Sequence, residues 1–400
     1  MGGEPMREVV VALALRTPVG KAPRGSLSQT RPDDLGAAIL RAILDRVPQL
    51  DPKRIDDVIL GCAMPEGPQG MNVGRNVVLL AGLPDRVPGM TVNRFCSSGL
   101  ETIGIGAAQI ATGQSEIVIA GGVESMSLVP MGGLRYSPSP RLMTEDPGAA
   151  LGMGLTAERL AELDGIGREA QDAFALHSHR KAVAARDAGR FDDELVAVRT
   201  RRSAPDAAGR PVERTVLVER DEGPREDTSL EALGRLATVF KRGGTVTAGN
   251  SSQTSDGAAA VLLTTPERAA ELELQPLARF RGYAVAGVAP GIMGIGPVEA
   301  VPKLLRRSGL RLEQMDVIEL NEAFAAQSLS VLKRLGISAE DERVNPNGGA
   351  IALGHPLGCT GAKLAATALH ELRRRGGRFA LVTMCIGLGM GAAGIFERAD

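Results

Sequence analysis

Residues 55–61 read IDDVILG and residues 315–321 read MDVIELN, so one short apolar segment recurs after about 260 residues. Two further pairs of segments keep this approximate spacing, namely 93–100 with 347–361 and 117–122 with 381–387. Self-similarity at a fixed spacing indicates a duplicated structural unit. We therefore expect two homologous halves, residues 1–121 and 273–400, that pack against each other.

Within each half, short runs rich in β-branched residues alternate with alanine-rich stretches of helical length. This alternation is typical of α/β proteins, so the expected fold class is α/β. Residues 117–120 and 380–384 are continuously apolar, as expected for central strands that helices cover on both faces. The sheets are therefore expected to lie between layers of helices.

Residues 122–248 differ from both halves, because they combine a loop-like stretch, an amphipathic helical stretch and a charged stretch. We interpret them as an inserted loop domain. The next segment, residues 249–272, contains the apolar run 258–263 and is expected to return to the N-terminal half as a strand. Active sites often form where two such halves meet.

The composition is that of a globular protein, and its charges are balanced. The 46 basic and 47 acidic side chains nearly cancel, which argues against nucleic acid or an anionic membrane as a partner and favours a small molecule. The 4 cysteines lie far apart with no C-x-x-C pair, so we expect neither disulfides nor a metal site. No stretch resembles a signal peptide or a membrane span, and we expect a cytoplasmic location.

Cys96 lies in the stretch NRFCSSGL, where polar residues lead into an apolar helix. At a helix start, free backbone amides and the helix dipole favour a thiolate, which would lower the pKa of the cysteine from about 8.5 towards neutral. From its position alone, Cys96 could equally be a core residue. Gly99, Gly104 and Gly106 each cost about 1 kcal/mol inside a helix, so they indicate close packing there and favour a nucleophile.

His355 lies in NGGAIALGHPLGCTG and is one of 4 histidines. The glycines around it let backbone and substrate come close, and imidazole has a pKa suited to proton transfer. We therefore expect a catalytic role for His355. The other histidines, His177, His179 and His370, are expected on helix surfaces.

Cys385 lies in MCIGLGMG, where an apolar strand ends in a glycine turn. The backbone amide of Gly387 could point into a site there as an oxyanion donor. Cys359 is a competing candidate for a second reactive thiol, and the residues alone do not separate the two. Cys62 is interpreted as a core residue.

Four motifs, in this order, carry a resemblance that covers nearly the whole chain: NRFCSSGL at 93–100, NEAFAAQ at 321–327, the glycine-rich segment around His355, and MCIGLGMG at 384–391. The sequence resembles the thiolases, which are acetyl-CoA C-acyltransferases. The resemblance implies a layered α/β/α/β/α fold. It also implies reversible, CoA-dependent cleavage of a 3-ketoacyl-CoA to acetyl-CoA and a shortened acyl-CoA.

The same resemblance implies a role for each candidate residue. Cys96 would carry the acyl group, His355 would activate the thiols, and Cys385 would act as acid and base at the substrate α-carbon. Asn321 would hold a water that, with His355, stabilises the enolate oxygen. The backbone amides of Cys96 and Gly387 would stabilise the tetrahedral oxyanion.

Coenzyme A is implied as a substrate, and neither a permanently bound cofactor nor a metal is expected. The positions that match CoA contacts of the family are Arg225, near the adenine, and Ser252, near the pantetheine. Three further positions match the lining of the acyl end of the site: Met153, Met293 and Phe324.

The sequence departs from the family pattern at two places, and the first concerns the branch. The biosynthetic, acetoacetyl-specific branch usually has a histidine before Met-Gly, whereas Gly152 precedes Met153 here, so the chain resembles the degradative branch. Lys363 stands where arginine is usual, and we expect it on a helix surface.

The alternatives are a biosynthetic acetoacetyl-CoA thiolase, a more remote ketoacyl-synthase-like condensing enzyme, and a catalytically silent lipid-binding or scaffolding relative. The family implies a homodimer or homotetramer. A hydratase and dehydrogenase partner is left open.

Overall fold

The strand order repeats in the two halves of the chain. A computed structural model describes residues 6–206 and 209–399. The strands of the main sheet are β1 (Val10–Arg16), β2 (Gly20–Lys21), β3 (Asp57–Gly61), β4 (Met90–Val92), β5 (Ile117–Ser125), β8 (Ser255–Thr264), β9 (Ala278–Gly287), β10 (Val317–Leu320), β11 (Phe379–Ile386) and β12 (Met390–Arg398). The first half has the order β3-β5-β8-β1, with β4 beyond β3, and the second half has β10-β11-β12-β9. Pairs at equivalent places agree in direction: β3–β5 and β10–β11 are parallel, whereas β5–β8 and β11–β12 are antiparallel.

Two aspartates occupy equivalent places in this repeat. Asp56, just before β3, accepts a hydrogen bond of 3.0 Å from the Ile117 amide at the start of β5. Asp316, just before β10, accepts one of 3.0 Å from the Phe379 amide at the start of β11. Each carboxylate fixes the beginning of the neighbouring parallel strand, which explains why these two segments resemble each other.

The two halves share one hydrogen-bonded sheet. β1 pairs with β9 through Val10–Arg279 and Val11–Ala278, so the sheets expected for the two halves are joined edge to edge. The return of residues 258–263 to the first half is confirmed, because β8 pairs with both β1 and β5.

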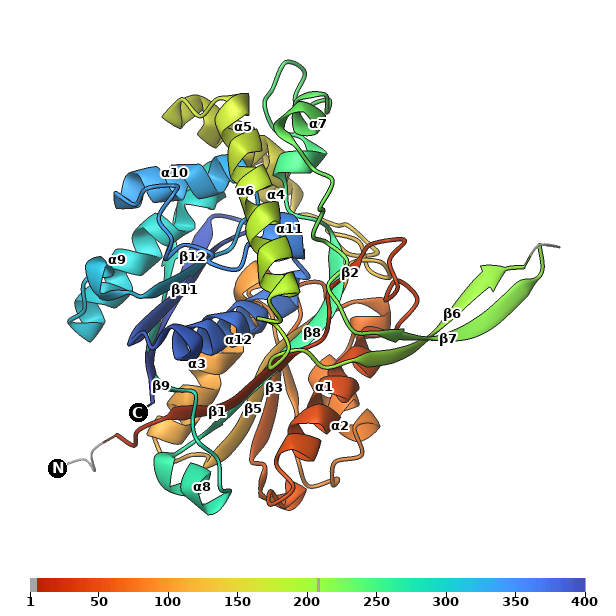
Figure 1. The fold of residues 1–400 in the computed structure, drawn as a ribbon, viewed down its shortest axis with the longest axis vertical. Coiled ribbons are helices and arrows are strands. Elements are labelled where there is room, and N and C mark those ends of the chain that lie inside the picture. Colours follow the sequence, from red (N-terminus) through yellow and green to blue (C-terminus); the bar gives the residue numbers. More distant parts are fainter. Residues whose placement is uncertain (1–5, 207–208, 400) are drawn as a thin grey trace.

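Helices form three layers around these strands (Figure 1). The central layer holds α3 (Ser98–Ala111) and α12 (Leu357–Arg375), and α12 contacts β5 and β8 of the first half and β10 and β11 of the second. The outer helices are α1 (Pro32–Arg46) and α2 (Val73–Leu80) on the first half, and α9 (Gly296–Ser308) and α10 (Ala325–Leu335) on the second. The α/β/α/β/α arrangement is confirmed.

The two central helices, α3 and α12, cross so closely that only glycine fits at the crossing. A Cβ at Gly99 would lie 2.8 Å from the backbone of α12, and one at Gly361 would lie 2.2 Å from the backbone of α3. α3 begins two residues after Cys96, and α12 begins two residues after His355. The crossing therefore brings the loops that carry these two side chains together.

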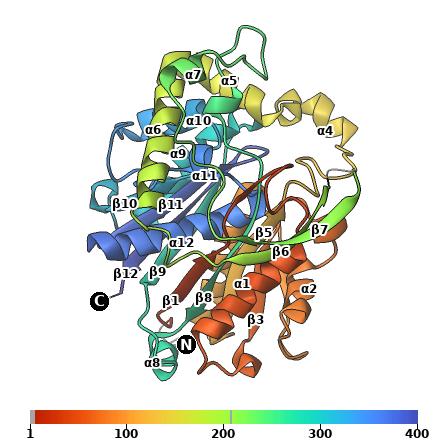
Figure 2. The same cartoon turned by 45° about the vertical axis from the view of Figure 1, so that its right-hand side comes forward.

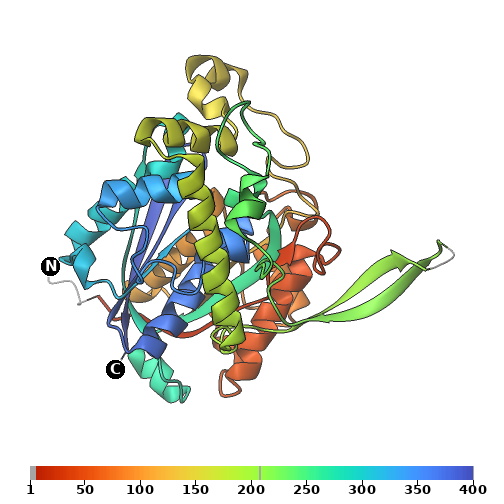
Figure 3. The ribbon, with the colours of Figure 1, turned by 45° about the horizontal axis from the view of Figure 1, so that its top comes forward.

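Residues 122–248 cover one end of this core (Figure 2). Their helices are α4 (Pro140–Glu145), α5 (Met153–Asp164), α6 (Arg168–Asp187) and α7 (Leu230–Gly234). β6 (Val198–Pro205) and β7 (Pro211–Val218) form a hairpin that projects from the body (Figure 3). The remaining α-helices are α8 (Pro266–Glu271) and α11 (Ala350–Leu353). In residues 6–206 and 209–399, no helix combines the length and apolar character needed to cross a membrane.

The expected surface positions of Lys363 and His179 are wrong. Lys363 is 1% exposed, because α12 lies between the strands of both halves and has no solvent face along this part. His179 is 4% exposed, because α6 is covered by α7, α10 and α11. His370 is partly buried, and its Nε2 lies 3.0 Å from the Ala14 carbonyl oxygen.

Candidate active site

Cys96 lies in a single 3-10 turn, η3 (Phe95–Ser97), directly before α3. Asn93 shapes this turn, because its Oδ1 accepts a hydrogen bond of 2.8 Å from the Phe95 amide while its Nδ2 donates one of 3.0 Å to the Ala63 carbonyl. Phe95 has φ +43°, a left-handed conformation that costs energy for a bulky residue. The turn places the Cys96 side chain, which is partly exposed, in the lining of a cavity.

The pKa of Cys96 is not lowered towards neutral, contrary to expectation. Burial raises the pKa of this thiol to about 11. Backbone hydrogen bonds from Gly387 and from Cys96 itself oppose the effect of burial, and the negative charge of Glu124 adds to it. Desolvation outweighs the amides at this helix start, so the Cys96 thiol is neutral at physiological pH.

His355 lies between the short helix α11 and α12, with its ring fixed by Thr360. The Thr360 hydroxyl donates a hydrogen bond of 2.8 Å to the Pro356 carbonyl, so at its 2.6 Å contact with His355 Nδ1 it accepts. Nδ1 therefore carries the proton, and the unprotonated Nε2 is a hydrogen-bond acceptor. Burial lowers the pKa of His355 to about 3, with a contribution from the charge of Lys363, so the ring is neutral at physiological pH.

Asn321 lies at the end of β10, behind the His355 ring. Its Nδ2 is 3.3 Å from His355 Nε2. Its Oδ1 is buried and has no hydrogen-bond partner among the described residues. A buried amide oxygen without a partner is costly, which indicates an acceptor that a water or a ligand satisfies.

Cys385 and Cys359 lie in different surroundings. Cys385, near the end of β11, lines the same cavity as Cys96, and burial raises its pKa with a further contribution from Cys96. Cys359 is 1% exposed and packs in the core between α12 and the strands. The geometry therefore puts Cys385, and not Cys359, beside the first thiol.

The cavity has a volume of about 370 Å³. It is lined by eight of the ten candidate residues: Cys96, Met153, Ser252, Met293, Phe324, His355, Cys385 and Gly387. Asn321 does not line the cavity but contacts one of its lining residues, His355. Arg225 does not line this cavity either.

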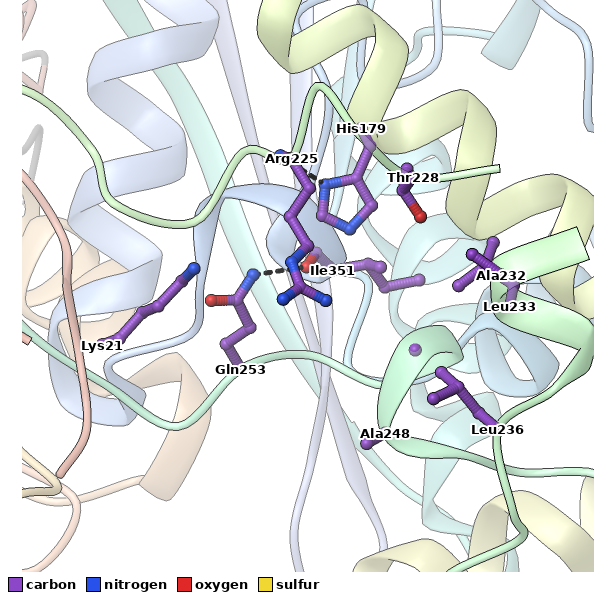
Figure 4. A pocket seen from close by; sticks show the side chains of 11 residues that line it. Lys21, His179, Arg225, Thr228, Ala232, Leu233, Leu236, Ala248, Gln253 and Ile351 are labelled. Carbon is purple, nitrogen blue, oxygen red and sulfur yellow. Dashed lines mark hydrogen bonds between the residues drawn. The ribbon is translucent and has the colours of Figure 1, made fainter. Parts of the chain in front are cut away.

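Arg225 lines a second cavity of about 380 Å³, together with Lys21, His179 and Gln253 (Figure 4). The backbone amide of Arg225 donates a hydrogen bond of 3.2 Å to His179 Nδ1. Consecutive residues line the two cavities, Ser252 the first and Gln253 the second.

Two buried polar residues of the site were missed in the sequence. Thr360 sets the His355 ring, and its position five residues after the histidine could have indicated this. Glu124 accepts hydrogen bonds from the amides of Ala63, at 2.7 Å, and Gly358, at 2.7 Å. Nothing in the sequence around Glu124 distinguishes it from a surface carboxylate, because both partners are distant in the chain.

Known proteins resemble the chain along its whole length. It matches the family Thiolase, N-terminal domain, over residues 9–267 and Thiolase, C-terminal domain, over residues 274–398. A 3-ketoacyl-CoA thiolase of Bacillus subtilis is 51% identical over 392 residues, which are 98% of this chain and 100% of that protein. A beta-ketoadipyl-CoA thiolase of Pseudomonas aeruginosa is 49% identical over 411 residues, covering 98% and 99%.

A solved structure shows the same fold. The crystal structure of the Bacillus anthracis acetyl-CoA acetyltransferase superposes with a TM-score of 0.88 and 40% identity, and it covers 99% of this chain and 100% of that one. In residues 6–206 and 209–399, no group of three or more His, Cys, Asp or Glu side chains is arranged to hold a metal ion. The repeated sheet and the two family matches lead to one conclusion: the chain belongs to the thiolase family.

Proposed function

We propose that this protein is a degradative thiolase that cleaves 3-ketoacyl-CoA with coenzyme A to acetyl-CoA and a shortened acyl-CoA. One observation carries the proposal: the cavity is lined by two thiols, Cys96 and Cys385, and by the imidazole of His355. Cleavage of a carbon–carbon bond next to a ketone needs a nucleophile and a separate acid for the carbanion that leaves. Two thiols and one base satisfy both needs.

In the first half-reaction, the Cys96 sulfur attacks the keto carbon while His355 Nε2 takes its proton. The amides of Cys96 and Gly387, which oppose the raised pKa of the Cys96 thiol, would stabilise the resulting oxyanion. The loss of one such donor typically costs about 3 kcal/mol of barrier. Collapse of this intermediate breaks the bond between the α-carbon and the keto carbon, and leaves the acyl group on Cys96.

The electron pair of the broken bond passes to the acetyl-CoA enolate, and Cys385 gives its proton to the α-carbon. The buried Oδ1 of Asn321 suits a water that, with His355, stabilises the enolate oxygen. The imidazolium then returns its proton to the Cys385 thiolate. In the second half-reaction, His355 takes the proton of an incoming CoA thiol, which attacks the thioester, and gives it to the departing Cys96.

Coenzyme A is proposed to lie across both cavities, with its pantetheine beside Ser252 and its nucleotide beside Lys21 and Arg225. Two cations at one end suit phosphate groups, and the shared segment at Ser252 and Gln253 suits the connecting arm. Met153, Met293 and Phe324 would then contact the acyl end.

The division into halves 1–121 with 249–272 and 273–400, around the insertion 122–248, remains our proposal, as do the cytoplasmic location and a dimer or tetramer. Biosynthetic condensation of two acetyl-CoA is the alternative reaction. Initial rates of CoA-dependent cleavage across 3-ketoacyl-CoA chain lengths separate the two. We expect cleavage beyond four carbons, and strict specificity for acetoacetyl-CoA would contradict the degradative proposal.

A further inference from the structure

Residues 130–139, here called the flap, form part of the wall of the cavity around Cys96. Met131, Gly132 and Tyr136 line the cavity from this segment. The flap belongs to no helix or strand, and most of its residues are exposed. An irregular, exposed segment keeps its place only where specific contacts hold it.

Glu66 provides such contacts. Its Oε2 accepts hydrogen bonds from the backbone amides of Leu134, at 2.7 Å, and Arg135, at 3.2 Å. In the described part of the chain, these are the hydrogen bonds that join the flap to a residue distant in the sequence. Hydrogen bonds to a carboxylate are about twice as strong as those between neutral groups. Glu66 is therefore the polar anchor of the flap.

Two glycines let the flap approach Glu66. Gly133 has φ +82°, and a Cβ there would lie 2.2 Å from Glu66 Oε1. Next to Glu66, a Cβ at Gly67 would lie 2.6 Å from the Leu134 side chain. The local sequence of both segments thus fits this contact.

Glu66 is also connected to the loop of the catalytic histidine. Its amide donates a hydrogen bond of 2.7 Å to the carbonyl of Met64, which lines the cavity. The Met64 amide donates one of 3.2 Å to Glu124, whose carboxylate accepts another of 2.7 Å from the Gly358 amide. The flap is therefore joined through Glu66 to the segment that follows His355.

We propose that Glu66 is a positioning residue for substrate binding, which holds the flap against the cavity so that Met131 and Tyr136 contact the bound acyl-CoA. The inference rests on the proposed thiolysis and adds a residue that acts on binding and not on the chemical steps. Glu66 does not line the cavity itself, so it acts through the flap. When only a fraction of the molecules hold the flap in place, the affinity for the substrate falls in proportion to that fraction.

Steady-state kinetics with 3-ketooctanoyl-CoA test this role. Glu66→Ala removes the acceptor, and we expect it to raise KM by about 10-fold or more while kcat changes by less than about 2-fold. Glu66→Gln is the matched control, because it keeps one side-chain oxygen for the two amides and should recover most of the affinity. An unchanged KM in Glu66→Ala, or a fall in kcat alone, would overturn the inference.

Hydrogen exchange tests the contact without any substrate. The amides of Leu134 and Arg135 should exchange at least about 10-fold faster in Glu66→Ala than in the wild type, while the amides of β5 stay unchanged. Asp51→Ala is the control, because it removes a carboxylate that accepts one amide, that of Lys53 at 2.9 Å, outside the flap. It should leave the exchange of the flap as in the wild type.

Equal exchange of the two flap amides in Glu66→Ala and the wild type would overturn the inference. If the wild type does not cleave 3-ketooctanoyl-CoA, the proposed function is overturned instead, and the exchange measurement still decides whether Glu66 holds the flap.

Discussion

The Glu124 carboxylate accepts a hydrogen bond of 2.7 Å from the Gly358 amide, three residues after His355. The same oxygen accepts one of 2.7 Å from the Ala63 amide, whose carbonyl holds Asn93 in the Cys96 loop. A single buried carboxylate thus joins the His355 loop to the Cys96 loop. We infer that it positions these two side chains.

Glu124→Gln should therefore lower kcat more than it raises KM. Glutamine has one acceptor oxygen in place of two, so buried amides lose partners, and we expect a loss of about 2 to 4 kcal/mol of stability. Asp256→Asn is the matched control, because Asp256 is also buried and accepts hydrogen bonds of 3.0 Å from Ser125 and 2.9 Å from the Ser127 amide. If Glu124→Gln and Asp256→Asn lower the stability by the same amount and also lower kcat by the same factor, Glu124 has only a structural role.

Thr360→Val should lower kcat while KM changes little, because the His355 ring loses the acceptor that keeps the proton on Nδ1. We expect a fall of about 10-fold to 100-fold, as for partners of other functional histidines. Thr360→Ser keeps the hydroxyl and should restore most of the rate. Steady-state kinetics of both variants measure this, and equal rates in the two would contradict the role of Thr360.

Lys363 is expected to be a structural cation. Burial raises the pKa of Glu319 to about 8, which Lys363 opposes, and both Glu319 oxygens are buried without a hydrogen-bond partner in the described chain. Lys363→Met should cost about 3 kcal/mol, because it removes the cation that opposes the raised pKa of Glu319 and leaves the buried carboxyl with no polar partner.

The double variant Lys363→Met with Glu319→Gln should recover part of this loss. Denaturant unfolding of the three variants measures the coupling. A loss of stability below about 0.5 kcal/mol in Lys363→Met is typical of a surface residue and would contradict the structural role of Lys363.

His179 should make the fold sensitive to acid. Burial lowers the pKa of His179 to about 4, with a contribution from Arg225, whereas an unfolded histidine titrates near 6.5. Because the folded pKa is depressed, stability is fully present above about pH 6.5 and is lost as the pH falls towards 4. His179→Asn keeps an acceptor for the Arg225 amide but does not titrate.

The stability of His179→Asn relative to the wild type should therefore rise by about 2 kcal/mol between pH 7 and pH 4.5. Urea unfolding at both pH values measures the difference. A constant difference would mean that His179 is accessible to water in the folded protein.

The sequence predicts the fold because its signals are local and repeated. The recurrence of residues 55–61 at 315–321, the apolar strands and the return of β8 all depend on patterns within short windows. The position of Lys363 could not be predicted, because a helix between two sheets and a surface helix differ only in what packs against them.

The sequence predicts which residues line the cavity, but it does not predict the pKa of Cys96. The motifs place Cys96, His355 and Cys385 in one cavity, as the structure shows. The raised pKa of Cys96 results from the walls around it, which come from distant parts of the chain. For the same reason, Glu124 is recognised only from its contacts with Ala63 and Gly358.

The most direct test of the account is the covalent state of the thiols. In Cys385→Ala incubated with acetyl-CoA, transfer to Cys96 needs no proton at the α-carbon, so an acetyl group should accumulate on Cys96. Peptide mass mapping should find it there, and not in Cys96→Ser. An acetyl group on Cys359, or undiminished thiolysis by Cys96→Ser, would contradict the assignment of Cys96 as the residue that carries the acyl group.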